Sequence, residues 1–121
     1  MKEHDWKTIV GQIPSKSNQY RIVTIHGHGS LAKSKSLTEY EKSFYMQVGE
    51  YRNLGIDGFF EIYVRVYFST MSHDIDNSLK CLLDCLQHAG TIKNDNRCVK
   101  VVAEKFIDKM NPRIEFRIVE V

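Results

Sequence analysis

The segment FEIYVRVYFS, residues 60–69, restricts the fold most, because two kinds of side chain alternate along it without a break. The first kind is apolar and comprises Phe60, Ile62, Val64, Val66 and Phe68. The second kind is polar or aromatic and comprises Glu61, Tyr63, Arg65, Tyr67 and Ser69. Successive side chains of a β-strand point to opposite faces of a sheet, so a period of two predicts a strand. We expect its apolar face to lie on the core and its other face to be amphipathic.

Shorter segments favour further strands, since they are rich in β-branched and apolar residues bounded by turn formers. These segments are residues 8–13, 20–26, 97–107 and 113–120. Turns are indicated by PSKSN after Ile13, by GHG at 27–29 and by Asn111-Pro112.

A first helix is predicted to begin at Ser36, because Glu39 follows three residues later and the pair matches a capping box. One apolar face then recurs at helical spacing, through Leu37, Tyr40, Phe44, Val48 and Tyr51. The loop-forming residues at 53–58 end this element.

A second helix is predicted after the strand at 60–69. Its apolar stripe consists of Leu79, Leu82, Leu83 and Leu86, and its polar side carries Asp76, Lys80, Asp84 and Gln87. Gly90 is positioned to end the helix as a C-cap. Cys81 and Cys85 share one side of it, and we interpret them as small buried residues rather than zinc ligands.

The resulting order, β-β-α-β-α-β-β, predicts an α+β fold with two helices packed on one face of a mixed, mostly antiparallel sheet. A chain of 121 residues is long enough for one compact domain over 1–121 and too short for two. Three cysteines without a disulfide-framework spacing indicate a reduced, cytoplasmic protein. The opening sequence MKEHDWKTIV lacks the apolar segment of a signal peptide, and no apolar run could span a membrane.

Charge is unevenly distributed, although the net charge is only +2. The stretch from Trp6 to Ser36 contains no acid and these basic residues: Lys7, Lys16, Arg21, Lys33 and Lys35. A basic region apart from an acidic cluster suits a protein that holds a polyanion and a metal ion together. A solvated strand-and-loop surface explains the same pattern equally well. His26 and His28 lie in this stretch without an acid or cysteine nearby, so we do not expect a metal site there.

Two aspartates, Asp74 and Asp76, stand one residue apart at the start of the second helix. Asp76 can cap the helix by accepting from the first free N–H groups, but this does not explain Asp74. Two carboxylates so close repel each other unless a cation neutralises them, and hard oxygen ligands suit Mg²⁺ or Mn²⁺. A calcium EF-hand is excluded, because Leu79 and Cys85 stand where that loop needs Gly and Glu.

Lys80 and Asp95 each have a structural and a functional interpretation. Lys80 lies one helical turn after Asp76, where it can form an ion pair with Asp76 or Asp84, or contact a phosphate and stabilise developing negative charge. Asp95, in the sequence NDN, is favoured as a turn residue by its local sequence alone, although it could also supply a third carboxylate.

The spacing of these residues resembles the signature of the RusA family of Holliday-junction resolvases. The matching positions are Asp74-Ile75-Asp76-Asn77, Lys80, Asp84, Ala89-Gly90 and Asp95. The segment PSKSN and the following Tyr20-Arg21 are similar to the family's proline-and-lysine opening, and the resemblance extends from about Ile13 to Val121. One departure is visible, because Asn94-Asp95 stands where the family has an acidic pair.

The resemblance implies a homodimeric, Mg²⁺-dependent endonuclease, with Mn²⁺ as a possible substitute, that cuts four-way and other branched DNA in recombination and repair. Asp74, Asp76 and Asp95 would be the catalytic metal-binding carboxylates, and Lys80 would assist the reaction. Lys16, Lys33 and Lys35 would contact the DNA backbone. Two alternatives stay open: a nuclease for flaps or forks, and a DNA-binding protein on the same fold that does not cut.

Aromatic residues are also expected on the amphipathic side of the sheet. Trp6, Tyr63 and Tyr67 could stack on unpaired bases, but we expect them to pack on the sheet or to form a dimer surface.

Overall fold

The computed structural model describes residues 2–15, 20–25 and 28–121, and for residues 20–25 and 28–33 it describes the backbone alone. Its strands are β1 (Lys2–Glu3), β2 (Lys7–Val10), β3 (Tyr20–Ile25), β4 (His28–Lys33), β5 (Phe60–Phe68), β6 (Cys98–Ile107) and β7 (Arg113–Glu120). Its helices are α1 (Lys35–Gln47) and α2 (Ile75–His88), with short 3₁₀ helices at Gly49–Tyr51 and Asp95–Arg97. The expected strand at 60–69 and the two expected helices are therefore confirmed.

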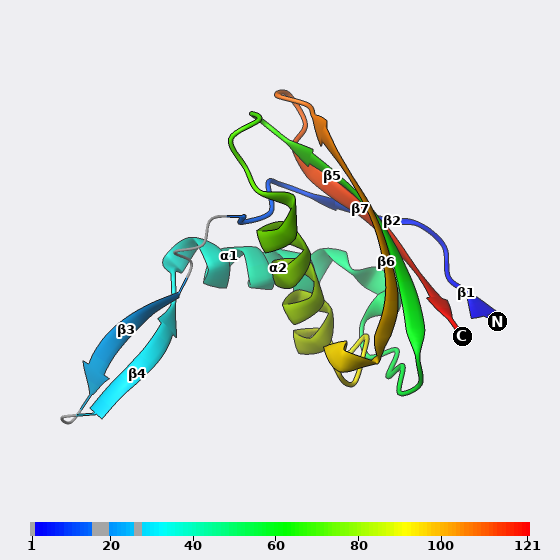
Figure 1. Cartoon of the computed structure of the whole chain (residues 1–121), viewed down its shortest axis with the longest axis horizontal. Helices are drawn as coiled ribbons and strands as arrows, with labels where there is room; N and C mark the ends of the chain where they lie inside the picture. Colours follow the sequence, from blue (N-terminus) through cyan, green and yellow to red (C-terminus); the bar gives the residue numbers. More distant parts are fainter. Residues whose placement is uncertain (1, 16–19, 26–27) are drawn as a thin grey trace.

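A mixed, five-stranded sheet forms the body of the protein. Strands β1 and β2 pair with β7, and β7 pairs with β5, all antiparallel. Strand β6 pairs with β5 in parallel and forms one edge of the sheet. Both helices lie on one side of this sheet (Figure 1), so the predicted α+β class is confirmed.

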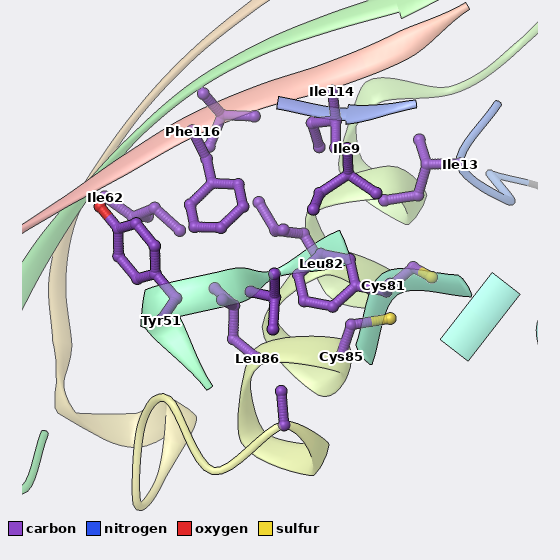
Figure 2. Close-up of a cluster of buried hydrophobic side chains, with 14 of the residues drawn as sticks. Ile9, Ile13, Tyr51, Ile62, Cys81, Leu82, Cys85, Leu86, Ile114 and Phe116 are labelled. Atoms are coloured by element: carbon purple, nitrogen blue, oxygen red, sulfur yellow. The ribbon is translucent and has the colours of Figure 1, made fainter. Parts of the chain in front are cut away.

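The apolar side of β5 is the centre of the core. Its five apolar residues are each at most 2% exposed: Phe60, Ile62, Val64, Val66 and Phe68. Figure 2 shows Leu82 and Leu86 of α2 gathered with Ile62 and Phe116 in this cluster. Phe44 of α1 stacks on Phe116, with 6.0 Å between ring centroids. The alternation in the sequence thus predicted which face of the sheet the helices cover.

The other side of β5 is covered by ring–guanidinium contacts within the same chain. The guanidinium of Arg65 lies 4.1 Å from the ring centroid of Trp6. Arg117 and Arg113 lie over the rings of Tyr63 and Tyr67, at 4.9 and 3.8 Å. Each aromatic side chain is therefore packed on the sheet, as expected.

The start of α1 differs from the prediction. Ser34, and not Ser36, is the N-cap, and its Oγ accepts a hydrogen bond from the N–H of Leu37 at 3.2 Å. Ser34 is extended, with φ −66° and ψ 159°, while Lys35 is already helical. The capping box of Ser36 and Glu39 is therefore wrong, because two serines in this short segment can both cap a helix and only the first one precedes it.

A strand was also missed at residues 28–33, where the sequence suggested a turn and the entry to a helix. His28–Lys33 instead forms β4, which pairs antiparallel with β3 in a separate two-stranded sheet. This hairpin extends from the body beside the start of α1 (Figure 1). Gly29, within this strand, weakens the strand signal in the sequence, because glycine has little strand propensity.

Helix α2 ends where the sequence predicted, although Ala89 is the C-cap residue and Gly90 directly follows it. Gly90 has φ +72°, a conformation that residues with a side chain rarely adopt. A Cβ at this position would also lie 2.6 Å from Oδ1 of Asn53. None of the helices in the described ranges is long and apolar enough to cross a bilayer.

Candidate active site

Asp74 and Asp76 stand at the N-terminal end of α2, and both are exposed. Asp74 is the N-cap residue, with φ −92° and ψ 130°, and Asp76 lies in the first turn. The interpretation of Asp76 as the cap is therefore wrong, since Asp76 is already inside the helix. The carboxylate of Asp74 makes no capping bond and instead accepts from the side-chain amide of Asn77 at 3.4 Å. A cap residue whose carboxylate leaves the helix amides unbonded has oxygen atoms to offer to another cation or donor.

The loop that carries Asp74 is held from two sides. The N–H of Ser69 donates to Oε1 of Gln12 at 2.7 Å. The ammonium of Lys105, on the neighbouring strand β6, donates to the main-chain oxygens of Met71, at 2.9 Å, and His73. These bonds hold the loop against Gln12, which follows β2, and against β6. They fix the direction in which the chain enters α2.

His73, which directly precedes Asp74, is fixed in one orientation. Its ring stacks on Phe68 with 4.9 Å between centroids and an interplanar angle of 9°. Oε1 of Gln12 accepts from Ser69, so the amide nitrogen of Gln12 is the donor to Nε2 of His73 at 3.2 Å. The ring proton must then be on Nδ1, which donates to Oγ of Ser15 at 2.8 Å. The sequence carried no signal for this role of His73.

Lys80 lies near the pair of aspartates, whereas Asp95 lies far from them. Lys80 is exposed on α2, one turn beyond Asp76, as its spacing predicted. Asp95 is exposed in the 3₁₀ helix Asp95–Arg97, and its N–H donates to Oε1 of Gln87 at 3.1 Å. Gln87 belongs to the last turn of α2, so Asp95 lies at the end of the helix opposite Asp74.

The three predicted metal ligands are therefore not brought together within one chain. Helix α2 has 14 residues, which at a rise of about 1.5 Å per residue gives a length of roughly 20 Å. A Mg²⁺ ion binds oxygen at about 2.0–2.1 Å, so it cannot reach across that length. Within the part of the chain that the structure describes, no three His, Cys, Asp or Glu residues lie close enough to hold a metal ion.

The structure describes only some of the lysines that are predicted to contact DNA. Lys35 is the first residue of α1 and is exposed. Lys33 ends β4, and its side chain is outside the description. Lys16 and His26 lie outside the described residues, and His28 begins β4.

The cysteine prediction is confirmed for α2. Cys81 and Cys85 are free thiols in the core, 7% and 1% exposed, and Figure 2 shows them side by side on the helix. The hydrogen bond that the Cys85 thiol donates to Cys81, together with burial, raises the pKa of the Cys85 thiol far above its ordinary value. A thiol that does not ionise is a poor zinc ligand, because zinc binds the thiolate.

Comparison with known protein families identifies a family to which this chain is similar. The sequence model of the family described as endodeoxyribonuclease RusA matches residues 13–119 of this chain. A search of curated proteins found no match. The matched segment includes both ends of α2 and therefore all three aspartates and Lys80. Over almost its whole length, this chain belongs to the RusA family of endodeoxyribonucleases.

Proposed function

We propose that this protein is a Mg²⁺-dependent endonuclease that cuts four-way DNA junctions as a homodimer, with each active site built from both subunits. Membership of the RusA family supports nuclease action on junctions. The observation that carries the shared site is the position of Asp95 beside Gln87, at the end of α2 opposite Asp74 and Asp76. Two chains in antiparallel relation would supply Asp74 and Asp76 from one copy and Asp95 from the other.

The donor atoms fit the implied metal. Asp74 and Asp76 offer carboxylate oxygens, the ligand type that Mg²⁺ prefers, and the carboxylate of Asp74 is not used as a helix cap. When bound, the ion would supply charge relief on the phosphate and activation of a water molecule. The carboxylates would hold the ion, and Lys80, one turn along α2, would stabilise the negative charge that develops on the phosphate.

The outer edge of β6 is a suitable surface for the second copy. Strand β6 has ten residues, and in the described part of the chain no strand pairs with its outer edge. Its exposed apolar residues are Val99, Val101, Val102, Phe106 and Ile107, with exposed fractions between 37% and 56%. A long apolar edge strand tends to pair with another strand. Antiparallel pairing of two β6 strands gives a closed, two-fold dimer.

This pairing would also join the two halves of the site. Strand β6 begins directly after Asp95–Arg97. It ends beside the loop that carries Asp74, where Asp108 donates to the oxygen of Phe68 at 2.8 Å and Lys105 donates to Met71. In an antiparallel pair, the beginning of each β6 lies next to the end of the other. Asp95 of each copy would therefore approach the Asp74 end of the other copy, and the dimer would have two equivalent sites.

Two equivalent sites match the substrate. A four-way junction has near two-fold symmetry, and its resolution requires two cuts. A two-fold dimer presents one site to each of the two strands that must be cut.

The decisive experiment mixes two inactive variants, Asp74→Asn and Asp95→Asn, under conditions in which subunits exchange. In a shared site, the mixed dimer combines intact Asp74 and Asp76 of one copy with intact Asp95 of the other. One of its two sites is therefore complete, and we expect nicking of a synthetic four-way junction in Mg²⁺ without paired cutting. Each variant alone should be inactive.

Differently tagged subunits provide the control, because co-purification shows that mixed dimers form. Mixed dimers without nicking activity would contradict the shared site. Nicking of linear duplex at the same rate would contradict junction specificity. Faster cutting of flaps or forks than of four-way junctions would favour the alternative of a nuclease for other branched DNA.

A further inference from the structure

Lys105 departs from the pattern of the strand that carries it. In β6 it pairs with Val66 of β5, which is fully buried, and side chains that pair across a sheet point to the same side. The neighbouring positions on this side of β6 are apolar, Val101 and Ala103. A lysine at such a position requires partners, because burying part of a charged group without them is costly. Residues that break a local pattern in this way often serve a function.

The partners of Lys105 lie in the loop of residues 69–74, which we call the Asp74 loop. This loop joins β5 to α2 beside the end of β6 (Figure 1). The ammonium of Lys105 donates to the main-chain oxygen of Met71 at 2.9 Å and to that of His73. Two of its three N–H groups are therefore used within the loop. The bond to His73 reaches the residue directly before Asp74.

The ammonium of Lys105 is itself held in a rigid surrounding. It lies 5.7 Å from the ring centroid of Phe68, which is fully buried, and that ring stacks on the ring of His73. The main chain just beyond β6 is anchored at the same place, because the N–H of Asp108 donates to the oxygen of Phe68 at 2.8 Å. Lys105 therefore holds the Asp74 loop from the paired ends of β5 and β6.

Asp74 depends on such support, because its side chain does not hold the start of α2. It is the N-cap residue, but its carboxylate makes no bond to the helix amides. It accepts a long hydrogen bond of 3.4 Å from the side-chain amide of Asn77. The course of the main chain through Met71 and His73 thus decides where this carboxylate lies, and Lys105 is bonded to both residues.

We propose that Lys105 is a positioning residue of the nuclease, which holds the Asp74 loop in the course that keeps the carboxylate of Asp74 available to a metal ion. The inference rests on the proposed metal-dependent cutting. Lys105 touches neither the ion nor the DNA, and it acts through the main chain before Asp74. Removing a group that orients a metal ligand typically lowers metal affinity or activity by about 10- to 100-fold. A lysine that only stabilised the fold would leave the affinity for the ion unchanged.

The test compares Lys105→Met with the wild type, because methionine keeps an unbranched apolar side chain and removes the charge and the N–H donors. In metal-free protein, hydrogen–deuterium exchange should be faster in the Asp74 loop and the first turn of α2, and unchanged in the strands of the main sheet. The Mg²⁺ concentration needed for a given rise in melting temperature should increase about tenfold. The concentration for half-maximal cutting of a junction should increase equally, and saturating Mg²⁺ should restore most of the rate.

Two further variants separate this role from general effects of charge. Lys105→Arg keeps the positive charge and N–H donors, so it should recover most of the Mg²⁺ affinity that Lys105→Met loses. Lys109→Met removes an exposed lysine just beyond the same strand and should match the wild type in loop exchange and Mg²⁺ affinity. Light scattering should give the same particle mass for all of these proteins. A lower mass for Lys105→Met alone would assign its defect to assembly and overturn the positioning role.

The outcomes distinguish this inference from the proposed function. Unchanged loop exchange or an unchanged Mg²⁺ requirement in Lys105→Met overturns the positioning role, even if the wild type cuts junctions. Weaker metal-free junction binding with a lower salt slope also overturns it, since Lys105 would then be a phosphate contact. If the wild type binds Mg²⁺ without cutting, the proposed nuclease is wrong, while the melting temperatures still test Lys105. If Mg²⁺ does not stabilise the wild type, the metal site and the role of Lys105 are both wrong.

Discussion

The main-chain N–H of Asp95 donates to the side-chain oxygen of Gln87 at 3.1 Å, and this bond holds Asp95 at the last turn of α2. Asp74 is the N-cap of the same helix. Residues that are predicted to bind one metal ion are therefore held at opposite ends of a helix of 14 residues. In the proposed shared site, a second chain would supply the ligand that each end lacks.

Gln87→Ala should reduce cutting without unfolding the protein. The substitution removes the acceptor that holds Asp95, while Gln87 is exposed and contributes little to the core. We expect the free energy of unfolding to change by about 0.5 kcal/mol or less, as for other exposed sites. Single-turnover cutting of a junction should be slower at low Mg²⁺ and recover at high Mg²⁺. Gln87→Glu replaces the amide oxygen with a carboxylate oxygen, which can still accept from the N–H of Asp95, and this variant should retain more activity than Gln87→Ala. Equal activity of all three proteins would show that this bond does not position Asp95.

Asp74→Asn should abolish cutting while junction binding persists or strengthens. The change keeps the size of the side chain and the preference for the N-cap position, and it removes one negative charge that would repel the DNA phosphates in the proposed site. Repulsion between Asp74 and Asp76 also disappears, so the metal-free variant should melt at or above the temperature of the wild type. Added Mg²⁺ should raise the melting temperature of the wild type more than that of the variant, because an ion bound only by the folded state stabilises it. Cutting at the wild-type rate would show that Asp74 is not needed for the reaction and that the paired aspartates only form the start of the helix.

Lys80→Ala should impair the reaction more than binding. Lys80 is exposed on the polar side of α2, and alanine has a high helix propensity, so the helix should persist. Loss of a positive charge close to the developing charge should lower the cutting rate by about 10²-fold or more. Circular dichroism checks that the helix content is retained. If the junction affinity falls while the cutting rate of the bound complex is unchanged, Lys80 is a DNA contact and has no role in the reaction.

Binding should be separable from cutting through the basic stretch that contains Lys16, Lys33 and Lys35. Lys35→Ala and Lys16→Ala should each weaken junction binding and lower the slope of log affinity against log salt by about 0.9 for each lost phosphate contact. Lys2→Ala provides a control, since Lys2 is an exposed lysine outside this stretch. An unchanged slope in both variants would indicate that the DNA binds to another surface of the protein.

The fold could be predicted where one local pattern determines an element. The alternation in β5 and the leucine stripe of α2 identified the two faces that form the core. Of that stripe, Leu82 and Leu86 are buried, while Leu79 and Leu83 are partly buried and pack against the core. Prediction failed where two residues offer the same local chemistry. Ser34 and Ser36 can both cap a helix, and only the observed backbone distinguishes them.

The candidate site was predictable to the same extent. Asp74, Asp76 and Lys80 are neighbours on one helix, so their spacing alone predicts that they lie together. Asp95 comes after the predicted helix end at Gly90, which is consistent with its position beyond the end of α2, but its bond to Gln87 has no signal in the sequence. The bonds of His73 to Gln12 and Ser15 join segments that are far apart in the chain, so no local pattern could have predicted them.

Val102→Lys, on the exposed edge strand β6, should both dissociate the dimer into monomers and abolish cutting. Val102 is 40% exposed, so the monomer should keep its fold, and a lysine on an edge strand opposes pairing with a second strand. Light scattering should show a dimer for the wild type and a particle of 14.1 kDa for the variant. Val10→Lys, at a position that is 66% exposed on β2, is the matched control and should remain an active dimer. A Val102→Lys monomer that cuts junctions at the wild-type rate would mean that one chain forms a complete site. Asp95 would then have to reach Asp74 by a rearrangement of its own chain, against the hydrogen bond that holds it beside Gln87.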